Sequence, residues 1–406
     1  MAEALNKESA NNEVNEHQTR VRNARELMRG LGLDALILAG DDDPARPDPG
    51  NVRYFVNASL PMTVADRIKL FLLLPSDGEP TLVVSPMMAF SSLAEAILCK
   101  RSWVKTVVTP STSIPDELAS LLKAKGLDSG KIGFCGNHPE FAQVRALLPG
   151  AIVEPARVRD DSGQERDLVD LLRVQLTKWE IARLEQAQHA VEEGARALAA
   201  SLVAGRTYNE MLAEVEYRAR RAGAEELFVP FSKGAEEWAH YGPPGWIEGT
   251  FKEGDMVAFE LNARIDGYWA QLPRTFLVGA QPSENQTYVF ETACRAHEAM
   301  RDKLKVGVTG AALWSAGFEM IDRAGLQPWA RHGHGMGLSM SEWFSVLPDD
   351  ETRVQDGQSL VLHATVIDSR TGSQALVGDQ YVIEDGQPRV LVRSSVGHEL
   401  VPERSL

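Results

Sequence analysis

The chain has 406 residues, which suits one large or two medium-sized domains, and it carries a formal net charge of −15. This charge argues against a nucleic-acid partner and against binding to an anionic membrane, because both polyanions need a basic patch. The three cysteines are widely separated and cannot all pair, and no apolar run reaches the roughly 18 residues that span a bilayer. We therefore predict a cytoplasmic protein without a membrane segment.

The first part of the chain predicts an α/β domain. Residues 1–16 are polar and acidic, which indicates a disordered tail, and residues 16–32 have the periodicity of a helix. The following predicted elements are strand 34–39, strand 68–75, strand 81–84, helix 91–98, helix 114–125 and strand 131–134. Because strands and helices alternate, residues 17–174 are expected to form one α/β domain.

A second domain is expected over residues 175–406. Thr177 followed by Glu180 is a capping-box pattern, which predicts a helix start just after the boundary. The predicted elements are helix 177–191, helix 207–222, strands 256–261 and 268–278, helices 283–303 and 310–324, and strands 359–366 and 379–384. The order helices, strands, helices, strands indicates two halves with the same layout.

Two stretches of the second domain carry a recognisable pattern. Residues 254–275 read GDMVAFELNARIDGYWAQLPRT, and residues 331–342 read RHGHGMGLSMSE. Both resemble the pita-bread family of methionine aminopeptidase, aminopeptidase P, prolidase and creatinase. The resemblance implies an α/β (α+β) fold, with a creatinase-like N-terminal domain before a C-terminal pita-bread catalytic domain. It also implies a homodimer, because the two-domain members place one N-terminal domain over the partner's active site.

The metal ligands of this family are largely replaced. Its metallopeptidases use Asp, Asp, His, Glu and Glu, since two dications need several carboxylates. At these positions the chain has Glu260, Gln271, His334, His363 and either Gly378 or Asp379. We therefore expect no metal and no cofactor. One ion held by Glu260, His334 and His363 is the alternative.

The resemblance to metal-free members suggests acid–base catalysis. His240 lies where creatinase has its working histidine, and imidazole titrates near neutral pH. Glu260 lies where ectoine hydrolases also carry a glutamate, and it is expected to attack the substrate or to deprotonate water. His334 and His363 are expected to stabilise developing charge. Alternatively, His240 is a surface histidine and Glu260 is a structural ion-pair partner.

Further residues are expected to bind substrate: Gln271, His332, Trp269, Glu342 and Arg67. His332 is two residues from His334, so both would face one side of an extended strand. Trp269 would wall an apolar pocket or belong to the core. Glu342 would orient a histidine or end a solvated loop. Arg67 lies near the place of a creatinase arginine that reaches the partner's active site and holds the substrate carboxylate.

The expected function is metal-independent hydrolysis of a C–N bond in a small molecule such as an amidine, a lactam or an amide. We do not expect creatine itself as the substrate, because Pro273 and His363 replace the two glutamates of the creatinase clamp. One alternative is a metal-dependent Xaa-Pro-type peptidase with a reduced metal site. Another is a pseudoenzyme that serves as a binding module, because this fold does not guarantee catalysis.

Overall fold

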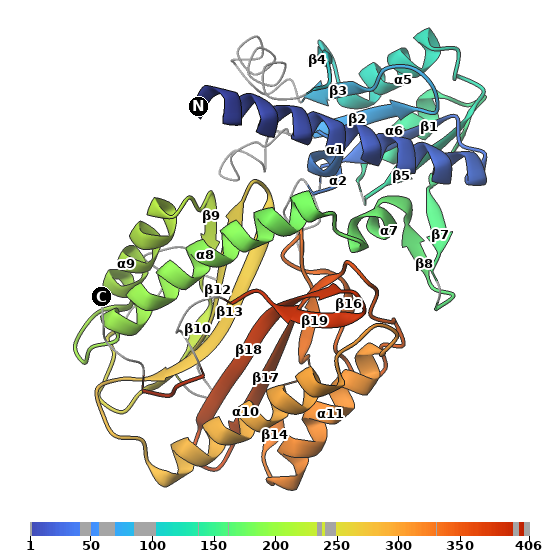
Figure 1. Cartoon of the computed structure of the whole chain (residues 1–406). Helices are drawn as coiled ribbons and strands as arrows, with labels where there is room; N and C mark the ends of the chain where they lie inside the picture. The colour runs from blue at the N-terminus through green and yellow to red at the C-terminus, as the bar shows by residue number, and fades with distance from the viewer. Residues whose placement is uncertain are drawn as a thin grey trace. The chain divides into compact units, whose positions relative to one another are not determined.

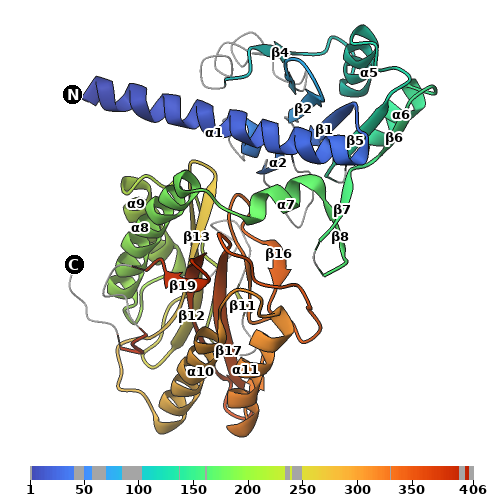
Figure 2. The same cartoon turned by 45° about the vertical axis from the view of Figure 1, so that its right-hand side comes forward.

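The computed structural model describes residues 2–40, 50–56, 70–84, 103–136, 138–160, 162–233, 238–239, 249–329, 331–392 and 398–401. They belong to two compact units, Met1–Arg173 and Val174–Leu406 (Figures 1 and 2). Within the described ranges, no helix is both long and apolar enough to cross a membrane.

The first unit is built on one mixed six-stranded sheet with the strand order β4-β3-β2-β1-β5-β6. Its elements are α1 (Ala2–Leu31), β1 (Ala35–Ala39), α2 (Gly50–Phe55), β2 (Leu70–Pro75), β3 (Thr81–Val84), β4 (Thr106–Val108), α5 (Ile114–Ala124), β5 (Lys131–Cys135), α6 (Glu140–Leu147), β6 (Ile152–Pro155), β7 (Arg157–Arg159), β8 (Glu165–Asp167) and α7 (Leu168–Val174). Strand β1 is central and runs parallel to β5 and antiparallel to β2. The predicted α/β layout is thus confirmed in the residues described.

Every residue of β1 is buried, as expected for a central strand covered on both faces. Ala35 and Ile37 belong to the core formed with helices α5 and α6. Leu36 and Leu38 are equally buried and point to the other face, because successive side chains alternate along a strand. Helix α2 packs against that region of β1 and β2.

Helix α1 begins earlier than the sequence analysis predicted. It runs from Ala2 through most of residues 1–16, the segment that the sequence analysis expected to be a disordered tail. No proline or glycine occurs between residues 2 and 29, and Ala, Leu, Glu and Lys favour a helix. His17 Nδ1 and Arg20 Nη1 both donate to the Tyr54 carbonyl oxygen, which ties the helix to α2. The predicted helix 91–98 lies outside the described residues.

The second unit repeats one layout twice. Its elements are α8 (Lys178–Ser201), α9 (Tyr208–Arg221), β9 (Glu226–Phe228), β10 (Phe231–Ser232), β11 (Trp238–Ala239), β12 (Met256–Ile265), β13 (Tyr268–Leu277), α10 (Glu284–Lys303), α11 (Gly310–Arg323), β14 (Gln327–Pro328), β15 (Gly333–Gly335), β16 (Glu342–Ser345), β17 (Ser359–Asp368), β18 (Ser373–Glu384) and β19 (Gln387–Val390). A helix pair precedes a long hairpin in each half: α8 and α9 precede β12–β13, and α10 and α11 precede β17–β18 (Figure 1).

Helix α8 starts where the capping box predicted it. The Thr177 side chain accepts from the Glu180 amide, and the Glu180 carboxylate accepts from the Thr177 amide. Helices α8 and α9 share a core with the first hairpin, and α10 packs on the second. The layout of helices, strands, helices and strands is therefore confirmed.

Strands β13 and β18 lie side by side and join the two hairpins through side chains. The backbone amide of Gln271 donates to Gln380 Oε1 at 2.9 Å, and Thr275 Oγ1 donates to the Leu376 carbonyl oxygen at 2.9 Å. These contacts are buried. As a result, residues from the two hairpins can face one shared cavity.

Candidate functional site

A cavity of about 390 Å³ lies in the second unit. Its volume is in the usual range of small-molecule pockets. It is lined by Phe228, Glu260, Asn262, Gln271, Trp329, Arg331, His334, Met340, Ser341, His363 and Thr365. Four residues that the sequence analysis selected, namely Glu260, Gln271, His334 and His363, are therefore brought together.

The hairpin strands present these side chains by simple alternation. Glu260 and Asn262 are two residues apart on β12, and His363 and Thr365 are two apart on β17, so each pair faces the same side. Gln271 on β13 is the register partner of Asn262. The local strand geometry thus accounts for the grouping of residues that are distant in sequence.

The surroundings of Glu260 compensate its negative charge only in part. Burial raises its pKa to about 7, although the Arg331 charge and a hydrogen bond from Gln271 both act to lower it. The group therefore exists in both protonation states near neutral pH. The Gln271 Oε1 atom is buried without a hydrogen-bond partner, which is consistent with its amide nitrogen facing Glu260.

The two cavity histidines are neutral bases. Burial lowers the pKa of His363 to about 3 and that of His334 well below its usual value, and the Arg331 charge adds to both shifts. His334 Nδ1 donates to the Gly335 carbonyl oxygen at 3.0 Å, which leaves the lone pair on Nε2. His363 Nδ1 is buried without a hydrogen-bond partner. The two ring centroids are 5.6 Å apart.

The fifth ligand position of the family holds no side chain. Gly378 on β18 is the register partner of His363, and a Cβ atom there would lie 2.2 Å from the Leu362 carbonyl oxygen. Asp379, the other residue that sequence alignment allows, does not line the cavity. It pairs instead with Arg274, with 2.8 Å between Oδ1 and Nη2.

Three expected substrate-binding residues lie outside the cavity lining. His332 is fully buried and stacks on Trp314 of α11, because Gly333 has a φ of +152° and breaks the strand alternation on which the prediction relied. The buried Trp269 ring lies beneath the Arg264 guanidinium, at 5.3 Å. Glu342 Oε1 accepts from the Ser339 amide and so orders the glycine-rich loop.

Two expected residues, His240 and Arg67, lie outside the described residues. Conversely, the sequence analysis did not assign a role to Arg331, which lines the cavity and donates to Ser341 Oγ at 3.0 Å. The only sequence signal for a role of Arg331 was its position immediately before the histidine motif. The charge of Arg331 reaches Glu260 and both histidines, so it sets the electrostatics of the site.

Comparison with known proteins places this cavity in a family context. Residues 182–385 match the profile of metallopeptidase family M24, and residues 20–158 match that of the creatinase/prolidase N-terminal domain. An Xaa-Pro dipeptidase of Pyrococcus furiosus is 26% identical over 228 residues, which cover 55% of this chain and 65% of that protein. The putative dipeptidase YkvY of Bacillus subtilis is 29% identical over 213 residues, which cover 51% of this chain and 57% of that protein.

Solved structures share the whole fold. The Xaa-Pro dipeptidase from Bacillus anthracis superposes with a TM-score of 0.75 at 18% identity, over 95% of this chain and 99% of that one. The prolidase from Pyrococcus horikoshii OT3 gives a TM-score of 0.74 at 21% identity, over 94% and 99% of the two chains. At this identity the likeness concerns the fold alone.

These relatives correct the function expected from the sequence. We expected a metal-independent hydrolase of a small non-peptide C–N substrate, and that expectation is wrong, because the similar proteins are named Xaa-Pro dipeptidase, dipeptidase or prolidase and the matching family is one of metallopeptidases. Replaced ligands indicate a changed metal site, but they do not identify a substrate. The M24 profile covers half of the chain, and the chain belongs to metallopeptidase family M24.

Proposed function

We propose that the chain hydrolyses small peptides of the Xaa-Pro type in this cavity, with the metal site reduced to a single ion. The observation that carries the proposal is the meeting of one carboxylate and two neutral imidazoles, Glu260, His334 and His363, in a cavity of dipeptide size. The name of the Pyrococcus furiosus relative, an Xaa-Pro dipeptidase, supports the substrate class. The expected homodimer and the cytoplasmic location stay predictions.

A two-ion centre does not fit these residues. Among the five ligand positions, only Glu260 offers a carboxylate to the cavity, and Gln271 is a neutral amide. The Gly378 position is closed, because a Cβ atom there would collide with the backbone of β17. The cation Arg331 also lines the cavity. One carboxylate cannot neutralise two dications beside a guanidinium.

A single transition-metal ion suits the chemistry of the donor set. His334 presents a lone pair on Nε2, His363 Nδ1 is buried without a hydrogen-bond partner, and Glu260 offers a carboxylate. These three side chains would hold the ion, which would supply a Lewis acid for the scissile carbonyl or lower the pKa of a water. The ligand atoms of these three side chains are not preassembled. Among the described residues, the one group of three whose ligand atoms lie within 4.8 Å of one another is outside this cavity.

Arg331 gives the cavity its preference for a free carboxylate. When Glu260 is ionised as a metal ligand, its charge balances that of Arg331, so the dication leaves an excess of positive charge that a substrate anion would offset. The guanidinium of Arg331 would bind the C-terminal carboxylate of a dipeptide. The side chains of Phe228, Trp329 and Met340 supply apolar walls that suit a proline ring.

Proline release from Xaa-Pro dipeptides tests the proposal. Tag-free protein is dialysed against chelator and then supplied with Mn²⁺, Co²⁺ or Zn²⁺. We expect proline release that depends on added metal. It should fall by more than about 100-fold in His334→Ala and in His363→Ala, because loss of even an outer partner of a metal ligand costs up to about 100-fold in activity. The exposed His189 supplies the matched control His189→Ala, which should behave as wild type.

The substrate carboxylate is tested separately with the same dipeptide as free acid and as C-terminal amide. Wild type should prefer the free acid through a lower KM, and Arg331→Met should lose that preference. Absence of proline release with every dipeptide and every metal would refute the peptidase proposal. An unchanged preference in Arg331→Met would refute the assigned role of Arg331 alone.

A further inference from the structure

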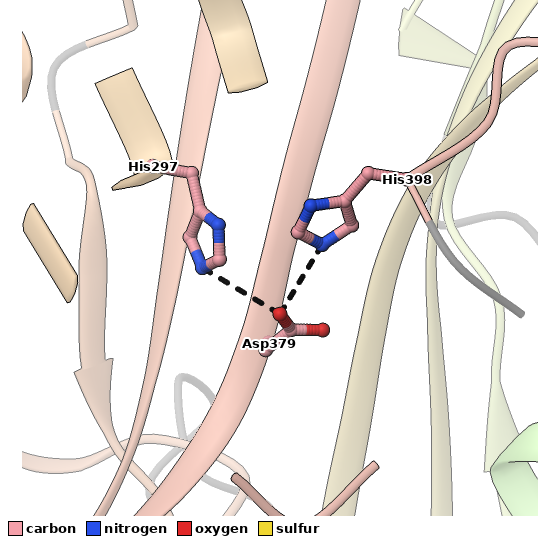
Figure 3. A group of neighbouring side chains, drawn as sticks. All are labelled: His297, Asp379 and His398. Carbon is pink, nitrogen blue, oxygen red and sulfur yellow. Dashed lines mark ion pairs between the residues drawn. The ribbon is translucent and has the colours of Figure 1, made fainter. Parts of the chain in front are cut away.

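A second cluster of metal-ligating side chains lies in the same unit, outside the cavity lining. His297 comes from helix α10, Asp379 from strand β18 and His398 from the C-terminal segment 398–401. Their ligand atoms all lie within 4.8 Å of one another, the only such group of three that the described residues form. Figure 3 shows that both imidazoles turn a ring nitrogen toward the same carboxylate.

The His297 separation leaves room for a shared ion, whereas His398 is within hydrogen-bonding distance of the carboxylate. His398 Nε2 is 3.2 Å and His297 Nε2 is 3.8 Å from Asp379 Oδ2. The longer distance exceeds that of a hydrogen bond. Ligand atoms at about 2.0–2.2 Å from a tetrahedral zinc ion lie about 3.3–3.6 Å apart, which falls between the two observed distances.

The buried histidine is in the protonation state that a metal requires. Burial lowers the pKa of His297 to about 3, so its imidazole is neutral. The Tyr381 hydroxyl lies 3.2 Å from His297 Nε2, and burial raises the pKa of this phenol, so the hydroxyl keeps its proton. A metal ion would select the tautomer whose Nε2 lone pair faces Asp379. An ion bound to His297 Nε2 would replace the contact with the Tyr381 hydroxyl.

A neighbouring residue orients the carboxylate. Arg274 Nη2 donates to Asp379 Oδ1 at 2.8 Å, which leaves Oδ2 toward the two histidines. Burial acts to raise the pKa of Asp379, but Arg274, His398 and His297 together outweigh it, so the pKa lies well below the usual range. Such an outer partner is typical of metal-binding carboxylates. His398 is 23% exposed, so solvent can reach the site.

We infer that His297, Asp379 and His398 form a binding site for one transition-metal dication of the zinc class, separate from the cavity. Two imidazoles and one carboxylate match the donors that zinc takes, and solvent completes the coordination. The ion would tie the C-terminal segment to α10 and β18. That segment is already anchored by the Leu277 amide, which donates to the Leu400 carbonyl oxygen at 2.8 Å.

Zinc titration of metal-free, tag-free protein tests the inference by calorimetry and by the shift in Tm. His398→Ala is the informative variant, because this partly exposed side chain can be removed without opening the core. We expect wild type to bind zinc at this site, and His398→Ala to lose more than about 100-fold in affinity together with the zinc-dependent rise in Tm. His189→Ala should keep both, whereas His363→Ala, which removes a ligand of the ion proposed for the cavity, should keep the binding event that His398→Ala loses.

The outcomes separate this site from the cavity. Zinc binding that disappears in His363→Ala and survives in His398→Ala would place the ion in the cavity and overturn the inference. Equal binding by wild type and His398→Ala, or no binding by wild type, would also overturn it. None of these measurements depends on peptidase activity, so the inference stands or fails independently of the proposed function.

Discussion

Glu260 and Asp379 belong to the two hairpins that repeat one layout, yet their surroundings shift the carboxyl pKa in opposite directions. Burial dominates at Glu260 and raises its pKa to about 7. At Asp379 the opposite charges outweigh burial, and the pKa falls well below the usual range. The difference lies in the partners: Asp379 has a direct contact with Arg274, whereas Glu260 has a hydrogen bond from neutral Gln271 and the charge of Arg331.

This contrast separates a reactive carboxylate from a fixed one. A group whose pKa lies near the working pH can take up and release protons, which suits catalysis or exchange with a metal. A carboxylate held by a buried guanidinium keeps its charge and its orientation. Changing one partner at a time tests the cause of each pKa shift. The following variants are measured in the presence of chelator.

The largest expected effect is on the Asp379 side. Arg274→Met leaves a buried carboxylate without its main partner, and breaking such a pair costs about 3–5 kcal/mol in the free energy of unfolding. Urea denaturation measures the loss. Arg218, whose pair with Glu214 is exposed, gives the control Arg218→Met, with a loss below about 1 kcal/mol. A similar small loss in Arg274→Met would show that Asp379 does not depend on Arg274.

A gain in stability is expected on the Glu260 side. The folded pKa of about 7 exceeds the ordinary 4.5, so the folded state binds the proton more tightly and stability falls as the pH rises from 4.5 through 7. Glu260→Gln removes this loss. The difference in unfolding free energy between the variant and wild type should rise by about 2–3 kcal/mol from pH 5 to pH 8.

The exposed Glu253 supplies the control for that measurement. Glu253→Gln should show no comparable rise between the two pH values. A pH-independent difference between Glu260→Gln and wild type would mean that the Glu260 charge is compensated in the folded protein, and the contrast with Asp379 would be lost.

The smallest effect concerns a carboxylate in a turn. Asp368 accepts hydrogen bonds from Asn285 Nδ2 and from the Arg370 amide and side chain, and the Arg370 and Asn285 hydrogen bonds hold its pKa well below the usual range. A lowered pKa contributes stability above the ordinary Asp pKa, and this contribution is lost as the pH falls below that value.

Asp368→Asn should therefore lower the Tm slightly at pH 7, and the difference from wild type should shrink as the pH falls below about 4. Thermal melts across this pH range make the measurement. A difference that stays constant down to the most acidic pH would show that hydrogen-bond geometry, rather than charge, stabilises the turn.

Much of the fold could be predicted from local signals. The capping box at Thr177 and Glu180 predicted the start of α8, and apolar runs predicted β1, β3 and the long hairpins. The start of α1 could not be predicted, because charged and polar residues are compatible both with a solvated helix and with a disordered tail. Propensity alone is a weak guide for such a segment.

The resemblance to the pita-bread family assigned Glu260, Gln271, His334 and His363 to one site, and all four line the cavity. His332 was misplaced because Gly333, with a φ of +152°, interrupts the strand alternation. The direction of Asp379 depends on a one-residue register in β18, which no spacing rule decides. The cluster with His297 and His398 depends on tertiary packing between distant segments, so sequence patterns carry no sign of it.

Gly378 limits which metal ligands a substitution can restore to the cavity. Any side chain at this position would bring a Cβ atom to 2.2 Å from the Leu362 carbonyl oxygen and 2.8 Å from His363 Cα. Replacing His363 or Gln271 by a carboxylate takes one codon each, but a carboxylate at residue 378 also requires the backbones of two paired strands to move apart. Side-chain replacements at the other ligand positions would therefore not rebuild a complete two-ion site in this cavity.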